Sequence, residues 1–397
     1  MQGYLRADGR KGIRNVLVVA YTVECSHHVA REIAGRFRRR GVHLIGFPGC
    51  YPNDYAQHMM ERLCAHPNVG GVLVVSLGCE SLDRKRLADA IAESGRPVQT
   101  AVIQELGGTH KAIEAGAEWV GEALGRIQSA PRVEMRVEEL VVGAICGASD
   151  ATSGLTANPA IGRAFDVLVA RGATAIFEET GELIGCEHVL AERAATPELA
   201  RDILAVMEKT ARYYATLGHG SFAPGNVEGG LTTIEEKSLG AYCKSGSANL
   251  SGLLKPGDVP RRGGLYLLDV VPDGEVRFGF PNISDNAEIA EIIACGAHLV
   301  LFSTGLGSVV GSAVSPVIKV CANPETCRRM ADDMDINAGR ILEGHATLDD
   351  VGREIFDRIL ATASGSPTAS ERLGHEEFIL TYKSFEALRA TCLPTPA

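Results

Sequence analysis

Short apolar runs alternate with longer amphipathic stretches along most of the chain. In the first third, apolar runs at 14–22, 42–47, 71–76 and 97–103 alternate with stretches at 25–41, 54–68, after Leu82 and at 110–127, in which apolar residues recur every three or four positions. The runs predict β-strands and the stretches predict α-helices. Strands and helices in this order favour a parallel sheet covered by helices.

The same alternation returns after a polar segment at 129–139. Strands are predicted at 140–145, 173–179, 263–271, 297–305 and 316–323, with helices at 159–172, 181–217, 288–296 and 349–363. We therefore expect an α/β protein with two doubly wound, mainly parallel domains, the first Rossmann-like over 1–130 and the second over 136–397. The Gly-rich segment 218–262 is too long for a plain connector, so a functional, loop-rich insert is expected there.

Composition narrows the class of protein. The formal charge of −10 argues against a nucleic-acid groove, which needs a basic face. No apolar run reaches the roughly 18 residues of a membrane span, and the first residues, MQGYLRADGRKG, contain no apolar signal core. We expect a cytoplasmic protein that contacts neither nucleic acid nor membrane. Its 11 irregularly spaced cysteines suit free thiols, core packing or metal ligands better than a secreted disulfide framework.

The most polar strand end lies between Cys146 and Asn158. The apolar run 140–145 leads directly into a thiol, two hydroxyls, a carboxylate and an amide, which belong to Cys146, Ser149, Ser153, Asp150 and Asn158. Polar groups near a sheet edge need hydrogen-bond partners, either within the protein or from a ligand. A turn that caps the following helix would explain them, and so would a ligand site.

Four predicted strands end at a cysteine: Cys25, Cys50, Cys79 and Cys146. Ligands of open parallel sheets bind at the carboxyl ends of the strands. Thiols gathered there would suit Fe(II), Zn or an iron–sulfur cluster. The alternative is that each cysteine fills a small gap in the core.

Further candidates lie at other strand ends and in the insert. Glu178 and Glu179 end the strand at 173–179, the favoured place for chemistry, although such residues also cap helices. Lys237 in the insert could hold a carboxylate or act as a base. The segment STGLGS begins with Ser303 and Thr304 and could cradle an anion, but it fits no nucleotide-binding pattern.

Six motifs, in order along the chain, resemble a known enzyme family. They are GYLRADGRKGIRN, TVECS, HPNVGGVLVVSLGCE, CGASDATSGLTANPA, PGNVEGGLTTIEEKSLGA and DMDINAG. The sequence resembles the catalytic region of the altronate and galactarate dehydratases, a family that includes the large subunit of (2R)-sulfolactate sulfo-lyase. The resemblance implies a metal-dependent lyase, commonly with iron, that removes the C2 proton and a C3 group, water or sulfite, from a 2-hydroxy carboxylate to give a 2-oxo acid.

With this resemblance, the candidate residues receive roles. Cys25, Cys50, Cys79 and Cys146 are expected to bind Fe(II) or an iron–sulfur cluster, with Zn, Mn and Mg as alternative metals. Asp150 or Glu179 is the expected base, and Lys237 a further catalytic residue. Substrate oxygens are assigned to Ser149, Ser153, Asn158, Ser303 and Thr304.

Departures from the family pattern refine the expectation. Ala148 stands where a second glycine is usual, and Leu306 where sugar-acid dehydratases typically carry arginine. The loss of that cation favours a short acid such as sulfolactate, or a monocarboxylic sugar acid, over a six-carbon diacid. The small amino-terminal domain of the one-chain dehydratases does not precede the motifs. A small partner subunit carrying it, in an oligomeric assembly, is therefore expected.

Two other functional classes stay open. One is a nucleotide-dependent oxidoreductase, which the absence of G-x-G-x-x-G after the first strand disfavours. The other is a non-catalytic subunit that binds a carboxylate.

Overall fold

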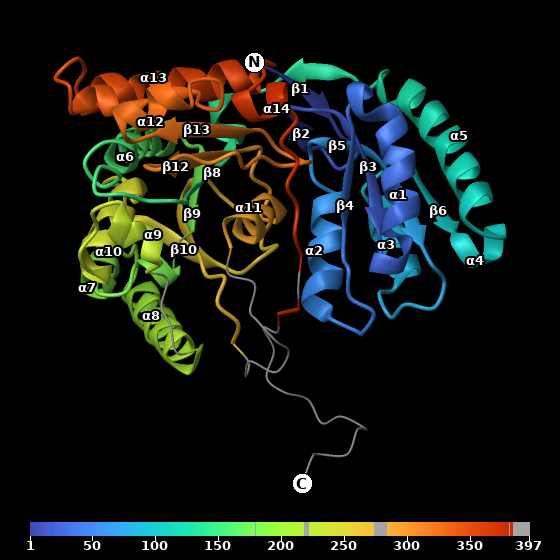
Figure 1. Ribbon diagram of the computed structural model, residues 1–397, viewed down its shortest axis with the longest axis horizontal. Helices are drawn as coiled ribbons and strands as arrows, with labels where there is room; N and C mark the ends of the chain where they lie inside the picture. The colour runs from blue at the N-terminus through green and yellow to red at the C-terminus, as the bar shows by residue number, and fades with distance from the viewer. Residues whose placement is uncertain (179, 218–221, 274–283, 381, 384–397) are drawn as a thin grey trace, which may run out of the picture.

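Two parallel β-sheets, one of four strands and one of seven, form the framework of the molecule (Figure 1). The computed structural model describes residues 1–178, 180–217, 222–273, 284–380 and 382–383. The α/β class predicted from the sequence is confirmed, because every strand pair in both sheets is parallel.

The four-stranded sheet has helices on both faces. Its order is β4 (Val42–Gly46), β3 (Val16–Tyr21), β5 (Val69–Ser76) and β6 (Val98–Val102). Alternate residues of β3 serve opposite faces: Leu17 packs with α1 (Glu24–Phe37) and α5 (Thr109–Ile127), whereas Val18 packs with α2 (Asp54–Cys64) and α3 (Arg84–Glu93). The apolar run of β3 is thus buried from both sides.

The seven-stranded sheet has the order β10 (Leu250–Leu254), β11 (Gly264–Leu268), β9 (Thr174–Glu178), β8 (Val141–Cys146), β12 (Leu299–Thr304), β13 (Val317–Cys321) and β14 (Ile336–Asn337). Helices α6 (Ala157–Ala170) and α13 (Leu348–Ala363) cover one face. Helix α11 (Asp285–Ala294) covers the other.

Helices α2 and α11 join the two sheets into one core. They pack against each other, and a single apolar cluster runs from β3 through both helices to β8 and β12. At their contact the Tyr55 hydroxyl donates a hydrogen bond of 2.5 Å to Glu291, which also pairs with Lys383 at 2.6 Å. The carboxylate is therefore buried with two partners.

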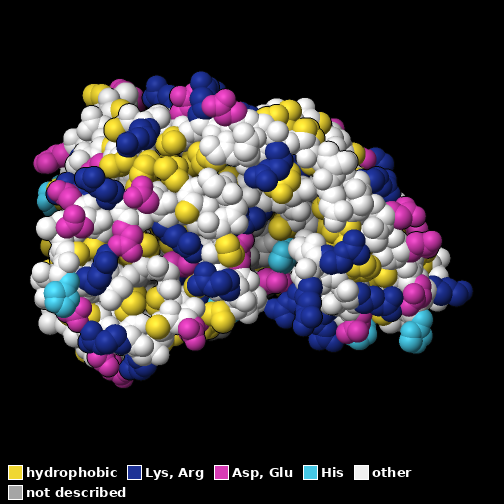
Figure 2. Space-filling view, turned by 90° about the horizontal axis from the view of Figure 1, so that it is seen from above, with side chains coloured by type: hydrophobic (Ala, Val, Ile, Leu, Met, Phe, Trp, Pro, Cys, Tyr) yellow, Lys and Arg dark blue, Asp and Glu magenta, His cyan; other side chains and the backbone are white. Residues whose placement is uncertain are grey.

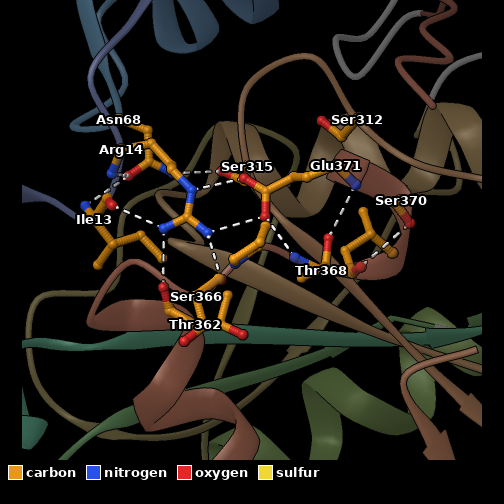
Figure 3. Close-up of polar contacts among 12 residues, drawn as sticks. Ile13, Arg14, Asn68, Ser312, Ser315, Thr362, Ser366, Thr368, Ser370 and Glu371 are labelled. Carbon is orange, nitrogen blue, oxygen red and sulfur yellow. Dashed lines mark hydrogen bonds and ion pairs between the residues drawn. The ribbon is translucent and has the colours of Figure 1, made fainter. Parts of the chain in front are cut away.

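A second connection is polar and centres on Arg14 (Figure 3). Its guanidinium makes two hydrogen bonds to the Glu371 carboxylate, 2.6 Å from Nε and 2.9 Å from Nη2, and also donates to the carbonyls of Thr362 and Ser366. Glu371 lies in α14 (Ala369–Leu373) and Thr362 in α13. The segment before β3 is thus held against the helices that end the described chain.

The structure also contains elements that the pattern did not predict. Strand β1 (Gln2–Leu5) pairs antiparallel with β2 (Lys11–Gly12) and with β7 (Arg132–Glu134), so part of the polar segment 129–139 is a strand. The helix predicted over 181–217 is interrupted and consists of α7 (Glu187–Glu192) and α8 (Pro197–Leu217). Pro197 starts α8, where its missing N–H costs nothing.

The insert 218–262 is more ordered than its composition indicates. Its described part holds α9 (Pro224–Glu228), α10 (Ile234–Tyr242) and β10. The Thr233 hydroxyl caps α10 by accepting a hydrogen bond from the Glu236 amide at 3.2 Å. Such caps and tertiary packing stabilise short helices that a Gly-rich composition conceals.

The remaining helices are short: α4 (Ile103–Leu106), α12 (Pro324–Arg329), and the 3₁₀ turns η1 (Arg38–Arg40), η2 (Val137–Glu139), η3 (Thr180–Glu182), η4 (Cys243–Ser245) and η5 (Ala338–Ile341).

In the part of the chain that the structure describes, no helix has both the length and the apolar composition needed to cross a bilayer. Basic and acidic side chains are interspersed over the face shown in Figure 2.

Candidate active site

The turn after β8 requires small residues and an unusual backbone. A side chain at Gly147 is excluded, because a Cβ there would lie 2.0 Å from Oδ2 of Asp285 and 2.5 Å from the Phe302 ring. Ala148 follows with φ of 51°, the one positive φ at a residue other than glycine in the described chain. This backbone conformation favours glycine, the residue that the family resemblance leads us to expect at this position. The tight turn brings Asp285 of α11 close to the end of β8.

Cys146, the last residue of β8, lies at the centre of a buried polar cluster. Its thiol donates to Oε2 of Glu182 at 3.3 Å and accepts a hydrogen bond from the Ser149 hydroxyl at 3.2 Å. Burial and the neighbouring Glu182 carboxylate raise the pKa of Cys146 to about 11. At neutral pH the group is therefore a thiol that donates a hydrogen bond.

Two buried lysines complete this cluster. Lys237 of α10 forms an ion pair with Glu182. Burial lowers the pKa of Lys237, but Glu182, Cys146 and Asp285 together outweigh it, and the pKa is raised overall. Lys244 is hydrogen-bonded to Cys146, and its burial lowers its pKa. Lys237 therefore stays protonated inside the protein, where it can bind a substrate carboxylate.

Acidic side chains surround the cluster on the side of α11. Burial and then the Glu182 charge raise the pKa of Asp285 to about 6. Burial and then Asp285 raise the pKa of Glu288 to about 8. Glu178, at the end of β9, is 1% exposed, its Oε2 has no hydrogen-bond partner among the described residues, and burial raises its pKa well above the usual range. Asp285 is thus the group of the three that is mostly ionised at neutral pH and can accept a proton there, whereas Glu288 is mostly protonated.

Two cavities flank this arrangement. One, of about 220 Å³, is lined by Cys146 and the following turn and by α10, including Ser149, Asp150, Ser153, Asn158 and Lys237. The other, of about 330 Å³, is lined by Ser284, Asp285, Asn286, Ser308, Val309, Val310 and Glu377. The sequence-predicted turn and Lys237 therefore share one cavity, and Asp285 lines the other.

The Asp150 carboxylate is held by hydrogen bonds from its own turn and from a neighbouring segment. Its Oδ1 accepts hydrogen bonds from the amide and hydroxyl of Thr152, at 2.9 and 2.6 Å, and from the Ser153 hydroxyl at 3.3 Å. Its Oδ2 accepts one from Asn323 at 3.0 Å. A carboxylate with four donors organises the turn and ties it to the segment after β13. Its predicted role as a base stays untested, and Glu179, the alternative, lies outside the described residues.

The polar residues assigned to substrate oxygens fall into separate groups. Ser149 contacts Cys146, and Ser153 contacts Asp150. The Ser303 hydroxyl donates to Asn158 Oδ1 at 2.6 Å, which links β12 to the start of α6. The Thr304 hydroxyl accepts the amide of Gly307 at 3.0 Å and so shapes the Gly-rich loop after β12. Ser149, Ser153 and Asn158 line the same cavity as Cys146. Ser303 contacts this group through its hydrogen bond to Asn158.

The four cysteines predicted to bind metal do not gather in the structure. Cys25, Cys50 and Cys79 are exposed near the carboxyl edge of the four-stranded sheet, whereas Cys146 is buried in the other sheet. Among the described residues, no group of three or more His, Cys, Asp or Glu side chains is placed to hold a metal ion. These thiols therefore do not fit the donor set of an iron ion or cluster, and iron dependence itself stays a prediction.

Sequence reasoning missed the acidic face of α11. Asp285, Glu288 and Glu291 are spaced by three residues in a helix whose other residues, apart from Asn286, are apolar, so all three lie on one face, on which Glu288 and Glu291 are buried. That spacing is the signal in the sequence. It also missed the part played by Glu182 and Lys244, whose partnership with Cys146 arises only when η3 and η4 fold against β8.

Comparisons with known proteins match nearly the whole chain. The family described as "D-galactarate dehydratase/Altronate hydrolase, second domain" matches residues 3–128, and "D-galactarate/Altronate dehydratase, C-terminal" matches residues 137–385. The (2R)-sulfolactate sulfo-lyase subunit beta of Chromohalobacter salexigens is 33% identical over 392 residues, which cover 96% of each chain. The Escherichia coli altronate dehydratase is 30% identical over 96% of this chain and 77% of its own length, and the galactarate dehydratase (L-threo-forming) of that organism is 34% identical over 94% and 74%.

Proposed function

Because the chain belongs to the D-galactarate/altronate dehydratase family, we propose that it is a lyase acting on a 2-hydroxy carboxylate. The reaction removes the proton on C2 and a leaving group on C3, and the enol formed becomes a 2-oxo acid. The observation that carries this proposal is the buried cluster of Cys146, Glu182 and Lys237 beside a cavity at the carboxyl edge of the seven-stranded sheet.

Lys237 is the proposed site for the substrate carboxylate. It lines the 220 Å³ cavity, is 6% exposed and has its charge maintained by Glu182. When the substrate carboxylate is bound there, the C2 proton becomes more acidic, because the positive charge stabilises the enediolate that develops next to it. In the same cavity, the Asn158 amide donates one hydrogen to the Gly240 carbonyl at 3.0 Å and keeps a second for a substrate oxygen. The Ser149 hydroxyl, which donates to Cys146, would exchange that partner for a substrate oxygen.

Asp285 is the proposed base for the C2 proton. Its raised pKa, about 6, leaves it ionised at neutral pH and basic enough to accept a proton. Because Gly147 has no side chain, the Asp285 carboxylate lies against the turn that carries Cys146. Although Asp285 lines the second cavity, it is near enough to Lys237 for the lysine charge to act on its pKa. The proton goes to Asp285 as the C3 group leaves with its bonding electrons, as sulfite or as hydroxide that is protonated to water. The enol then takes a proton on C3 and loses its hydroxyl proton to solvent, which gives the 2-oxo acid.

A short substrate such as (2R)-sulfolactate is the proposed preference, with altronate-type dehydration as the second candidate. The relative from Chromohalobacter salexigens is named a sulfo-lyase subunit and aligns end to end with 96% coverage on both sides. Leu306 stands in the loop after β12 with its amide bonded to the Ala148 carbonyl at 2.9 Å, so this loop lies against the turn after Cys146 and carries an apolar side chain in place of a cation. That relative is also named subunit beta, which supports a partner subunit for this chain.

The test compares kcat/KM for (2R)-sulfolactate, altronate and galactarate, with the 2-oxo acid and released sulfite measured separately. The assay uses the protein co-purified from its native cell together with any partner. We expect sulfite release from sulfolactate and a preference of at least about tenfold over galactarate. The variant Leu306→Arg should narrow that preference, with Leu342→Arg, at another exposed leucine, as its matched control. A preference for galactarate in the unchanged protein would overturn the substrate assignment.

A further inference from the structure

A large groove lies away from the Cys146 cluster, between the two sheets. It has a volume of about 700 Å³ and is lined by Arg62, Leu254, Asp258, Val259, Pro260, Arg261, Arg262 and Tyr266. Arg62 belongs to α2 beside the four-stranded sheet, and the other residues belong to β10, β11 and the loop between them. We call it the arginine groove.

Its three arginines lack protein partners. Within the described ranges, none of the guanidinium groups of Arg62, Arg261 and Arg262 makes a hydrogen bond or an ion pair, whereas most other arginines of the protein do. The acid among the lining residues, Asp258, accepts a hydrogen bond from the amide of Lys255 at 2.8 Å. Three unpaired cations side by side are notable in a chain with a formal charge of −10.

The loop that carries two of these arginines is held in place. A Cβ at Gly257, where φ is +87°, would lie 2.5 Å from Nε2 of His58 and 3.2 Å from Cγ of Arg62, so the loop packs directly on α2. The Lys255 carbonyl accepts a hydrogen bond from the Cys295 thiol at 3.5 Å. At the other end of the loop, the Tyr266 hydroxyl donates to the Arg262 carbonyl at 2.9 Å. The backbone of the groove is therefore anchored before any ligand arrives.

We propose that the arginine groove binds a small organic polyanion that carries two or more phosphate or carboxylate groups. Guanidinium groups match both kinds of oxyanion through paired hydrogen bonds. The volume falls within the range of small-molecule sites, and Leu254, Val259 and Pro260 provide apolar surface for the carbon part of the ligand. A ligand there contacts both α2 and the β10–β11 loop, so its binding stabilises the folded protein.

The experiment is isothermal titration calorimetry of the complete chain with inorganic pyrophosphate and, separately, with citrate, at constant ionic strength. Acetate serves as the monoanion control. We expect at least one of the two polyanions to bind and to raise the melting temperature, with acetate doing neither. The polyanion that binds more tightly assigns the groove to phosphate or to carboxylate ligands.

Variants locate the binding. The triple variant R62A/R261A/R262A should bind about 10-fold more weakly or worse, whereas R39A/R329A/R353A, with the same change in charge at exposed arginines elsewhere, should bind within about twofold of the unchanged protein. The variant R62K/R261K/R262K should bind with intermediate affinity, because lysine keeps the positive charge but cannot make the paired hydrogen bonds of a guanidinium group. Circular dichroism and the melting temperature without ligand establish that each variant is folded. Failure of both polyanions to bind, or equal loss in the two alanine variants, would overturn the proposal.

Discussion

The thiol of Cys146 and the carboxylate of Glu182 lie 3.3 Å apart, with the thiol donating the hydrogen bond. Glu182 also forms the ion pair with Lys237, so one carboxylate holds a neutral donor and a cation at the end of β8. This relationship converts an apolar strand end into a charged site.

Replacing Lys237 with methionine should lower kcat/KM about 100-fold, because the substrate carboxylate loses its buried cation and Glu182 is left without a counter-charge. The effect should appear in KM as well as kcat. Lys85→Met is the matched control: its ion pair with Asp89 is on the surface, and activity should stay within twofold. Equal activities in the two variants would remove Lys237 from the site.

Asp285→Asn should reduce kcat at least about 100-fold, since a general base is lost while the shape of the side chain is kept. In the unchanged protein, kcat/KM should fall as the pH falls through about 6, the pKa of Asp285. Asn286→Asp, next in the chain, tests whether a displaced carboxylate can substitute; we expect no gain. A pH profile that is flat between 5 and 7 contradicts the assignment.

The same pKa predicts a change in stability. Burial raises the pKa of Asp285 from 3.8 to about 6, so the folded state binds this proton more tightly than the unfolded state does. Its stabilising contribution is complete below pH 3.8 and is lost as the pH rises through about 6. Above that pH, Asp285→Asn should therefore leave the free energy of unfolding unchanged or raise it by roughly 1 kcal/mol. Urea unfolding of the variant and of the unchanged protein at pH 5 and pH 8 measures the difference in their free energies of unfolding. A variant that is less stable than the unchanged protein at pH 8 alone would contradict the prediction.

Metal analysis addresses the predicted iron. Protein purified without oxygen should contain iron, but Cys146→Ser should leave its content unchanged, because the Cys146 thiol is protonated and belongs to no group of metal-binding side chains among the described residues. Cys79→Ser is the informative comparison, since Cys79 is exposed near the edge of the other sheet. Equal loss in both variants would indicate that the two thiols share one metal site, as the sequence predicts. Full iron content in both would exclude these two thiols as ligands.

Arg14→Ala should destabilise the protein by about 2 kcal/mol, because a paired set of charge-assisted hydrogen bonds and two bonds to carbonyls are lost together (Figure 3). Arg14→Lys should recover only part of this, since lysine cannot make the paired contact. Burial raises the pKa of Glu371, but the hydrogen bond and charge of Arg14 together with the hydrogen bonds from Thr368 outweigh it, so the pKa is lowered and this stabilisation is lost on acidification. Urea unfolding measures each variant, and an unchanged midpoint for Arg14→Ala would contradict the prediction.

Ala148→Gly should stabilise the protein by up to about 1 kcal/mol, because φ of 51° strains alanine and suits glycine. Ala115→Gly, at an exposed position inside α5, is the control and should cost about 1 kcal/mol. Thermal unfolding of both variants gives the comparison. Destabilisation at both positions would show that the backbone at Ala148 is not strained.

The sequence by itself determined the α/β class, most of the longer strands and helices, and the family. These features depend on local patterns: the apolar runs of β3, β5 and β8 and the amphipathic period of α1, α5 and α13 are visible in short windows. The polar turn after β8 was also evident, because Ser149, Asp150 and Ser153 are adjacent in the chain. Lys237 could be singled out for its place in a long Gly-rich segment.

Only the tertiary structure decided which of these groups meet. Residues 146, 182, 237 and 285 come from separate segments, and their partnership depends on strand order and on the packing of η3, α10 and α11 against the edge of the sheet. Burial, which raises the pKa of Asp285 and of Cys146, is likewise a property of the assembled core. The same strand-end rule that brings Cys146 to the site leaves Cys25, Cys50 and Cys79 near the edge of a different sheet. A sequence pattern gives the end of each strand, but the sheet to which each strand belongs is decided by long-range packing.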